Sequence, residues 1–447
     1  MKKCKKMLVT LLVMIMVINI CACSRSSTQV STSSDTVLKE PTKIVFFTVA
    51  ETLDEDQMKA QFKEFEESNN CEIEIVFTSS SDFKQQYTTM VASGAQIDVM
   101  GINIQDIRYL YDTGAVLPLN DYIEIDKSKF VEGALDAAIW NDNVYAIPYG
   151  AFYTSMGLYY NERLFNELGF NVPATFEEFY DLADKAREAG YYASTFQAGN
   201  MYDLPVLYML CLGQLVGGDG VGNIENICMG KAKYTDEVNV RAMQALADLA
   251  ANGVWDDGFL GTTEGTAAMA LFTSGQALTY ITGSWNLTSM KSVMGDDLKV
   301  TYMPLIDKTA THFTTCAKNC PSICIYSGVE ESKRQLLADF CEYISGASYQ
   351  QEILNLRCNG DLSNSFDIPV YLSVDGNDNE ILNYIKENFL PIGQDFLDWY
   401  WPPEVNTELA SQIQAVLGGE TTAEEAMAAV QSVQDKLFEE GYTFSPR

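Results

Sequence analysis

Apolar and polar positions follow a regular order in the part of the chain that begins near residue 43. Residues 43–49 form an apolar run, residues 56–67 repeat apolar side chains at helical spacing, and residues 72–77 alternate apolar with polar positions. These patterns predict a strand, a helix and a second strand. Two strands joined by a helix need a crossover, so we expect them to be parallel and the fold to be α/β.

The same order continues downstream. Residues 82–94 predict a helix, residues 97–100 a strand, and residues 104–111 a further helix. In open parallel sheets, the loops at the carboxyl ends of the strands line the ligand crevice. Glu51 follows the first strand and Asn103 the third. Both are therefore candidate site residues, with a solvated turn as the alternative for each.

Strand and helix signals alternate along the rest of the chain. Thr175 and Thr422 each precede a Glu by three positions, which is the capping-box spacing that starts a helix. A turn is predicted at 141–143. The predicted strands are 144–148, 156–160 and 276–281, and the predicted helices include 161–169, 176–189 and one that begins after Thr422.

Four lysines near the start precede an apolar run at residues 7–20, which ends in Ile20-Cys21-Ala22-Cys23. The run is shorter than the roughly 20 residues of a membrane-spanning helix and suits the core of a signal peptide. An aliphatic residue, a small residue and then Cys resemble the lipobox of bacterial lipoproteins. We expect a signal peptide at 1–22 and acyl chains, palmitate among them, on Cys23; an ordinary secretory signal is the alternative. The protein would then sit on the cell membrane, facing the extracellular or periplasmic side.

The charge balance argues against nucleic acid as a partner. Without residues 1–22 the chain keeps 25 basic and 61 acidic side chains, a net charge of −36. Binding to a phosphate backbone requires clustered Lys and Arg, and such a cluster occurs only in the expected signal peptide. The acidity is better suited to keeping an anchored protein soluble.

The length of the chain predicts more than one compact unit. The 425 residues beyond position 22 exceed the roughly 250 to 300 at which a single hydrophobic core stops growing. Residues 23–42 are rich in Ser and Thr and are expected to form a flexible tether.

The remaining cysteines are even in number, so disulfides stay open in an exported protein. They are Cys71, Cys211, Cys228, Cys316, Cys320, Cys324, Cys341 and Cys358. Most lie in apolar runs, where Cys behaves as a small hydrophobic residue, and we expect free thiols. The spacing from Cys316 to Cys324 is compatible with a metal site, but Pro321 and the apolar residues after it predict a strand that would scatter the thiols. We expect no metal and no cofactor.

Several motifs occur together in one order along the chain. They are Ala146-Ile147-Pro148, Leu158-Tyr159-Tyr160-Asn161, Pro173-Ala174-Thr175-Phe176-Glu177-Glu178-Phe179, Phe272-Thr273-Ser274-Gly275-Gln276-Ala277-Leu278, Gly283-Ser284-Trp285, Ala415-Val416-Leu417-Gly418-Gly419 and Thr422-Ala423-Glu424-Glu425-Ala426. This set resembles the family 1 extracellular solute-binding proteins. These are the sugar-capturing subunits of bacterial ABC importers and relatives of maltose-binding protein.

The resemblance implies a periplasmic-binding-protein-like fold of type II. Two α/β lobes, with mixed and mostly parallel sheets, would be joined by a hinge that the chain crosses several times, and the ligand would lie between them. On this basis lobe 1 comprises 43–150 and 304–356, and lobe 2 comprises 151–303 and 357–447.

A sugar presents apolar C–H faces and a belt of hydroxyls, so its receptor needs flat aromatic side chains with polar groups at the rim. Trp285, with Gly283 beside it, is the leading candidate, since the matching Trp in the family commonly stacks on a sugar ring; a core Trp is the alternative. Tyr153 and Tyr202 are further candidates. Trp401, in the cluster before two prolines, is either a ligand-stacking ring or part of the hinge packing.

Polar candidates come from the same loops. Glu51 and Asp361 would accept hydrogen bonds from hydroxyls, because an ionised acceptor makes bonds worth roughly 1.5 to 3 kcal/mol. Asn103 and Asn200 carry amides that both donate and accept.

Together these features predict a lipid-anchored subunit of an ABC importer that binds a carbohydrate, an oligosaccharide above all, and passes it to the permease subunits without altering it. We expect it to be a monomer. One alternative is the same fold with a non-sugar solute such as a glycerol phosphate or a polyamine. Another is a surface-anchored carbohydrate-active enzyme, although His312 is the only histidine and neither a Gly-x-Ser-x-Gly motif nor a Walker loop occurs.

Overall fold

The computed structural model describes residues 40–49, 55–78, 82–131, 134–149, 154–317, 321–357, 379–394 and 400–444. The chain divides into two units, residues 1–40 and residues 41–447, and the fold below is that of the second unit. The predicted signal peptide, Cys23 and nearly all of the predicted tether lie outside the described residues.

The first of two large sheets has five strands in the order β2-β1-β3-β12-β6. Their bounds are β1 Thr42–Val49, β2 Cys71–Thr78, β3 Val99–Asn103, β6 Ile147–Pro148 and β12 Pro321–Ile325. Strand β1 pairs in parallel with both β2 and β3, which confirms the predicted crossover, while β12 is antiparallel to β3 and to β6.

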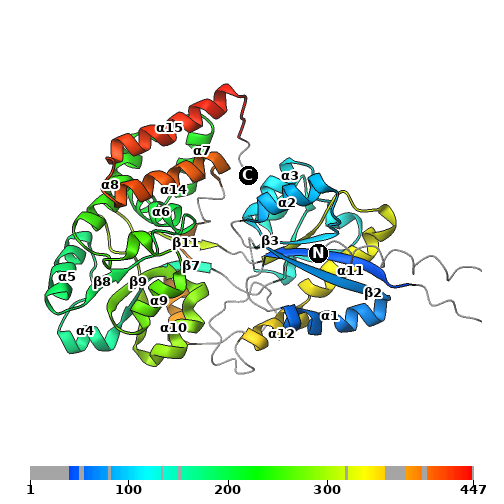
Figure 1. Ribbon diagram of the computed structural model, residues 1–447, viewed down its shortest axis with the longest axis horizontal. Coiled ribbons are helices and arrows are strands. Elements are labelled where there is room, and N and C mark those ends of the chain that lie inside the picture. Colours follow the sequence, from blue (N-terminus) through cyan, green and yellow to red (C-terminus); the bar gives the residue numbers. More distant parts are fainter. Residues whose placement is uncertain are drawn as a thin grey trace, which may run out of the picture. The chain divides into compact units, whose positions relative to one another are not determined.

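Helices cover both faces of this sheet, which explains why β1 is an apolar run with buried residues on both sides. Phe46 packs on one face against Phe62, with ring centroids 6.0 Å apart, and Phe47 stacks on Phe83 on the other at 5.2 Å. The helices on one face are α1 Glu55–Asn69, α11 Arg334–Ser345 and α12 Ala347–Arg357, and those on the other are α2 Phe83–Ser93 and α3 Gln105–Asp112 (Figure 1).

The second large sheet has six strands, in the order β13-β11-β7-β9-β8 with β10 also on β7. Their bounds are β7 Thr154–Asn161, β8 Tyr192–Thr195, β9 Ala277–Gly283, β10 Leu298–Thr301, β11 Thr314–Ala317 and β13 Gly393–Gln394. Strand β7 is antiparallel to β9, β10 and β11, whereas the pairs β8–β9 and β11–β13 are parallel. Both sheets are therefore mixed.

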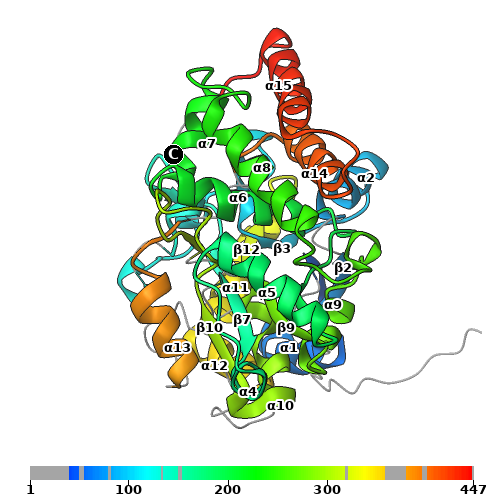
Figure 2. The same ribbon diagram turned by 90° about the vertical axis from the view of Figure 1, so that its left-hand side faces the viewer.

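Helices also pack on both faces of the second sheet (Figure 2). The first group is α5 Phe176–Glu188, α6 Asp203–Leu215, α8 Glu237–Ala251, α14 Pro403–Leu417 and α15 Ala423–Glu439. The second group is α9 Gly265–Thr273, α10 Leu287–Met294 and α13 Glu380–Tyr384. The two remaining helices of this part are α4 Glu162–Leu168 and α7 Gly220–Cys228. Short turns of 3-10 or π helix lie at Leu119–Asp121, Lys127–Lys129, Asp136–Ala138, Phe259–Gly261, Ser284–Asn286, Gly295–Asp297, Glu331–Lys333 and Ile385–Phe389.

The predicted helix caps form, with one change. The Asn161 carboxamide oxygen accepts the Leu164 N–H at 3.1 Å, and Thr422 with Glu425 makes a full capping box. At α5 the Thr175 hydroxyl accepts the Glu178 N–H, but the Glu178 carboxylate turns back to the N–H of Ala174, at 2.7 Å. Two backbone N–H groups at the start of the helix therefore still have acceptors, that of Glu178 in the Thr175 hydroxyl and that of Ala174 in the Glu178 carboxylate.

The predicted strand at 144–148 is interrupted. Strands β4 Ile139–Trp140 and β5 Asn143–Val144 form a small hairpin, and β6 begins later at Ile147. Asn141 and Asp142 make the turn with φ values of 50° and 65°, a conformation that Asn and Asp tolerate. The predicted turn is thus confirmed.

The chain passes between the two sheets after β6 and again after β11. Strand β11 pairs with β7, with Cys316 opposite Ser155, so residues 314–317 belong to the six-stranded sheet. The sequence predicted that lobe 1 resumes at residue 304, and this pairing disagrees with that boundary. We propose that lobe 1 resumes only with β12; the other lobe boundaries stay predictions.

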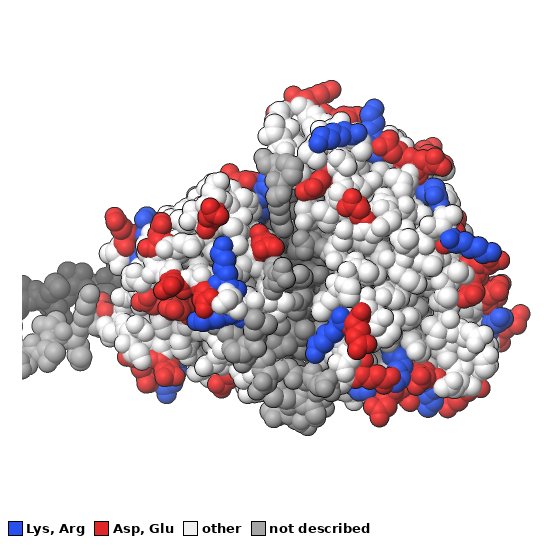
Figure 3. Space-filling model, turned by 180° about the vertical axis from the view of Figure 1, so that it is seen from behind, with Lys and Arg blue, Asp and Glu red and all other residues white. Residues whose placement is uncertain are grey.

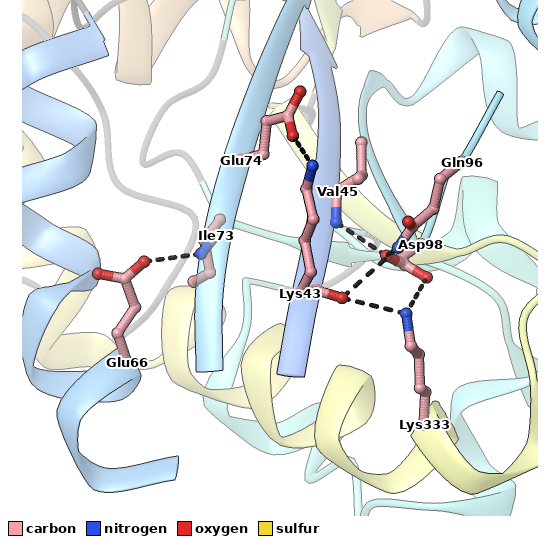
Figure 4. A network of polar contacts seen from close by, with 8 residues as sticks. All are labelled: Lys43, Val45, Glu66, Ile73, Glu74, Gln96, Asp98 and Lys333. Atoms are coloured by element: carbon pink, nitrogen blue, oxygen red, sulfur yellow. Dashed lines mark hydrogen bonds and ion pairs between the residues drawn. The ribbon is translucent and has the colours of Figure 1, made fainter. Parts of the chain in front are cut away.

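A buried polar cluster closes the amino ends of β1 and β3 (Figure 4). Asp98, 3% exposed, accepts the Val45 N–H at 2.8 Å and the Gln96 side-chain amide at 2.5 Å. The Lys333 ammonium donates to the Lys43 carbonyl at 3.0 Å and lies 3.5 Å from the second Asp98 oxygen. This set, called the Asp98 cluster below, joins two strands to the segment that leads into α11.

The described cysteines Cys71, Cys211, Cys228, Cys324 and Cys341 are buried, free thiols. Cys316 lies on β11 and Cys324 on β12, which are strands of different sheets. Among the described residues, no group of three or more His, Cys, Asp or Glu side chains is arranged to hold a metal ion.

Helix α6 is apolar on nearly every side because it is buried among other helices. In the described part of the chain, no single helix is long and apolar enough to cross a membrane. Only α6 and α7 taken together reach that length and composition, and they are bent by 106°.

Candidate functional site

Two of the predicted ligand rings follow neighbouring strands. Strands β8 and β9 are parallel, with Thr195 opposite Tyr280, so their carboxyl ends meet at one edge of the six-stranded sheet. The loop after β8 carries Tyr202, and the turn after β9 carries Trp285. We call residues 196–203 and 283–285 the β8–β9 edge. Such an edge is where open α/β sheets bind ligands.

Trp285 is 37% exposed, although every residue of the strand before it is buried. Its ring lies against the backbone of Gly283, where an added Cβ would come within 2.0 to 2.3 Å of the indole carbons. The turn is tied to the next strand, because the Ser284 hydroxyl accepts the Ser155 N–H at 3.1 Å. The sequence Gly-Ser-Trp thus holds a large, exposed ring in place through the Gly283 backbone and the Ser284 hydrogen bond.

The loop that carries Tyr202 is shaped by Asn200. The Asn200 side-chain oxygen accepts the Tyr202 N–H at 3.0 Å, a turn that Asn commonly makes. Tyr202 is 38% exposed, and α6 begins directly after it. Both predicted residues therefore lie at the same sheet edge as Gly283 and Trp285.

Three large, exposed apolar side chains belong to this edge. The large ones in the described part of the chain are Val91, Met201, Tyr202, Leu260, Trp285, Val293 and Ile392. Met201, Tyr202 and Trp285 belong to the β8–β9 edge. Leu260 lies in a neighbouring segment whose Thr262 carbonyl accepts the Gly199 N–H. Clustered apolar exposure marks binding surfaces more often than scattered exposure does.

A buried chain of polar side chains lies at the base of the edge. The Tyr280 hydroxyl donates to Gln197 at 3.0 Å, and the Gln197 amide donates to the Asp203 carboxylate at 2.9 Å. Burial raises the pKa of Asp203 to about 6, and the Gln197 bond only partly opposes this. We call Tyr280, Gln197 and Asp203 the Asp203 cluster. It was absent from the sequence-based candidates, although an acid opening an otherwise apolar helix is a signal for it.

A model of the family described as bacterial extracellular solute-binding protein matches residues 60–358, about two thirds of the chain. The chain belongs to this family. The match confirms the resemblance found in the sequence motifs. The members of the family bind solutes, and they are binding proteins rather than enzymes.

A multiple sugar-binding protein from Streptococcus mutans is similar in sequence to this solute-binding protein. The two are 27% identical over 246 residues, which is 52% of this chain and 55% of the relative. The chain thus spans about half the length of the curated relative that it matches.

Solved structures show the fold of the solute-binding protein. A chitin oligosaccharide binding protein has a TM-score of 0.73 and 20% identity, covering 89% of this chain and 99% of its own. A maltose-bound protein of T. maritima has a TM-score of 0.71 and 19% identity, covering 89% and 100%. With the two mixed sheets described above, these likenesses establish the two-lobed α/β fold of type II.

Asn103 lies at the carboxyl edge of the other sheet, so it does not share an edge with Trp285. It ends β3 opposite Pro321. Backbone and side chains are closely packed there: the Thr48 hydroxyl lies 3.2 Å from that of Tyr149, and a Cβ on Gly101 would come within 2.1 Å of Thr48. Asn103 is partly buried, and its role in binding stays a prediction.

Trp401 is placed differently from the other predicted rings. It is 5% exposed and packs in the core around α6, with its ring 6.2 Å from that of Tyr208. This burial favours the packing interpretation over ligand stacking. Glu51, Tyr153 and Asp361 lie outside the described residues.

Proposed function

We propose that the chain is the lipid-anchored solute-binding subunit of an ABC importer, and that it captures an oligosaccharide and delivers it to a membrane permease. The observation that carries the proposal is the pair of exposed rings, Trp285 and Tyr202, after the parallel strands β8 and β9. The names of the multiple sugar-binding protein and of the chitin oligosaccharide binding protein point the same way.

Exposed rings suit a sugar because its C–H faces are apolar and its hydroxyls project around the ring edge. An aromatic plane covers the C–H face, while amides and carboxylates at the rim bind the hydroxyls. At the β8–β9 edge, Asn200 lies two residues before Tyr202, and its side-chain NH2 group is a candidate for such a contact. Gly283 leaves room for the indole to lie flat on the backbone.

Capture works by population shift between an open and a closed arrangement of the two lobes. A ligand that contacts both lobes favours the closed form only through contacts that the open form lacks. The closed form is what the permease would recognise. A monomer is sufficient for this cycle.

The surface charge is compatible with a neutral ligand. On the face seen in Figure 3, acidic side chains outnumber basic ones, and the basic side chains are scattered. The described part of that face therefore shows no basic patch of the kind that binds nucleic acid.

A thermal-shift screen of the purified protein tests the ligand class. The probes are maltotriose, chitotriose, xylotriose and raffinose, with spermidine and glycerol 3-phosphate as non-sugar controls. A ligand at about 100 times its Kd adds about 2.7 kcal/mol to the free energy of unfolding. A shift with spermidine or glycerol 3-phosphate and none with any sugar would overturn the carbohydrate assignment. Chromatography of the incubated sugars completes the test, because cleavage products would indicate an enzyme.

The anchor is tested separately by metabolic labelling with radioactive palmitate in the bacterium that makes the protein. The wild-type chain is expected to take up the label and to fractionate with membranes. Cys23→Ser should lose both properties, while Cys71→Ser, a change in a buried thiol, should retain them. Equal labelling of the Cys23 variant would refute the anchor.

A further inference from the structure

The strand that leads to Trp285 and the loop that carries Tyr202 are joined by the hydrogen bonds of the Asp203 cluster. Tyr280 stands on β9, three positions before Gly283, and Gln197 stands two positions after the end of β8. Asp203 is the first residue of α6. All three side chains are buried, Asp203 with 9% exposure. The cluster thus connects the strand that leads to Trp285 with both ends of the loop that carries Tyr202.

The two halves of this loop are held in different ways. Outside partners reach the first half, where Ala198 donates to the Phe259 carbonyl and Gly199 to the Thr262 carbonyl, each at 2.9 Å. The Ala198 carbonyl also accepts from the Gln414 amide at 3.0 Å. The bonds of the second half, which carries Tyr202, include the turn at Asn200 and the bond between Gln197 and Asp203 across the base of the loop.

The surroundings of Asp203 leave its charge without a cationic partner among the described residues. Tyr280 from β9 and Gln197 from the loop face it, and the amino end of α9 at Gly265 adjoins both, since a Cβ there would lie 3.8 Å from the Gln197 nitrogen. Glu264 before α9 is exposed, and Asp256 is engaged by the Thr195 hydroxyl at 2.9 Å. Burial alone raises the pKa of Asp203, so this carboxylate takes up a proton near pH 6.

We propose that Asp203 is a positioning residue for ligand capture. Its carboxyl group holds the Tyr202 loop in register with the Trp285 turn through Gln197 and Tyr280, and it holds the loop more firmly when protonated. The inference rests on the proposed function, because it takes Tyr202 and Trp285 as the ligand-stacking rings. The buried carboxyl group is favoured in its neutral form, because desolvation outweighs the bond to Gln197 and opening of the loop would return the group to water, where its pKa is lower. Affinity is therefore expected to rise about fivefold from about pH 7.5 to about pH 5.

Hydrogen exchange without ligand tests the positioning role directly. Exchange of residues 198–203 is followed at both pH values and corrected for the intrinsic rates. In the wild type, protection should rise about fivefold at the lower pH. Asp203→Asn, which keeps the size and an acceptor oxygen but cannot ionise, should show the high protection at both values. A variant loop that matches the wild type at both pH values would overturn the proposal.

Asp98→Asn is the matched control, because it makes the same change in a buried carboxylate at the amino edge of the other sheet. It should leave the protection of residues 198–203 and its pH response as in the wild type. Loss of the response in this control would show that global stability governs the loop, which would also overturn the proposal.

The binding arm uses titration calorimetry with maltotriose, chitotriose, xylotriose and raffinose at the same two pH values. The wild type should gain affinity about fivefold at the lower pH, and Asp203→Asn should show the same, higher affinity at both. A wild-type affinity that does not change with pH would contradict the proposal. If none of these sugars binds, the proposed function fails, while the exchange experiment still decides the role of Asp203.

Discussion

The Asp98 cluster and the Asp203 cluster each contain a buried carboxylate at one edge of a sheet, but their chemical surroundings differ. Asp98 accepts a backbone N–H and a side-chain amide and faces the Lys333 ammonium. Asp203 has a neutral amide as its hydrogen-bond partner, and its pKa is raised by burial. The first cluster is balanced in charge, and the second is not.

The positions of the two clusters match this difference. The Asp98 cluster lies at the amino ends of parallel strands, where it stabilises the start of the sheet. The Asp203 cluster lies at the carboxyl ends, below two exposed rings. An uncompensated buried charge is more often kept where function needs it than where only stability is at stake. The comparison therefore supports the proposed division between a stabilising cluster and one that positions the candidate ligand rings.

The largest effect is expected from Asp98→Ala. It leaves the Val45 N–H buried without an acceptor and removes the partner of Lys333, so the free energy of unfolding should fall by about 3 kcal/mol. Urea denaturation measures the loss. Sugar affinity, measured on the folded variant, should stay unchanged. A loss of affinity in this variant would show that the two clusters do not differ in their effect on binding.

Trp285→Ala should have the opposite profile. Loss of the exposed ring is expected to weaken sugar binding at least about tenfold, or about 1.4 kcal/mol, with the melting temperature nearly unchanged. Calorimetric titration and thermal unfolding provide the two measurements. Val293→Ala removes another exposed apolar side chain, from α10, and should alter neither. A large loss of stability in the Trp285 variant would assign this residue to the core.

Asp203→Asn should stabilise the protein at neutral pH. Below about pH 4 the carboxyl is protonated in both the folded and the unfolded chain. Between there and the folded pKa of about 6, the unfolded chain releases its proton first, so stability falls as the pH rises. The amide variant avoids this cost but gives up a charged hydrogen bond, and we expect a net gain of about 1 kcal/mol. Denaturation at about pH 7.5 and about pH 4 should show the gain at the higher value alone. A loss of stability at the higher pH would place Asp203 with the stabilising carboxylates.

Gln96→Ala should have the smallest effect. Gln96 is exposed and donates one of several hydrogen bonds to Asp98, so its removal should cost about 0.5 kcal/mol. Gln197→Ala, the counterpart in the other cluster, should lower sugar affinity several-fold. Equal effects of the two changes on affinity would remove the contrast between the clusters.

The elements of the first sheet were predictable because the periodicity of apolar positions is local. The run at 43–49, the helical spacing at 56–67 and the alternation at 72–77 each reflect the environment of their own segment. The interruption at 144–148 was not predicted, since Val144 pairs with Ile139 and Ile147 with Ile323. These pairings depend on distant segments, which the apolar pattern of 144–148 does not reveal.

The candidate site was predictable in part. Trp285 and Tyr202 were found from motifs and from the polar interruption before α6, and the structure places both at one sheet edge. The bond between Gln197 and Tyr280 joins residues 83 positions apart, so no local pattern announces it. The burial of Trp401 likewise depends on Tyr208 from α6, a distant contact that the aromatic cluster around Trp401 does not reveal.

Among the four tryptophans in the described part of the chain, the exposed indole of Trp285 is suited to act as an optical reporter. Trp255 and Trp401 are buried, and Trp140 is stacked on Tyr111 with ring centroids 4.4 Å apart. Acrylamide dissolved in the medium would therefore quench the fluorescence of Trp285 more strongly than that of these three residues. A guest molecule lying on that ring would shield it from the quencher, so occupancy can be followed in unlabelled material under a fluorimeter.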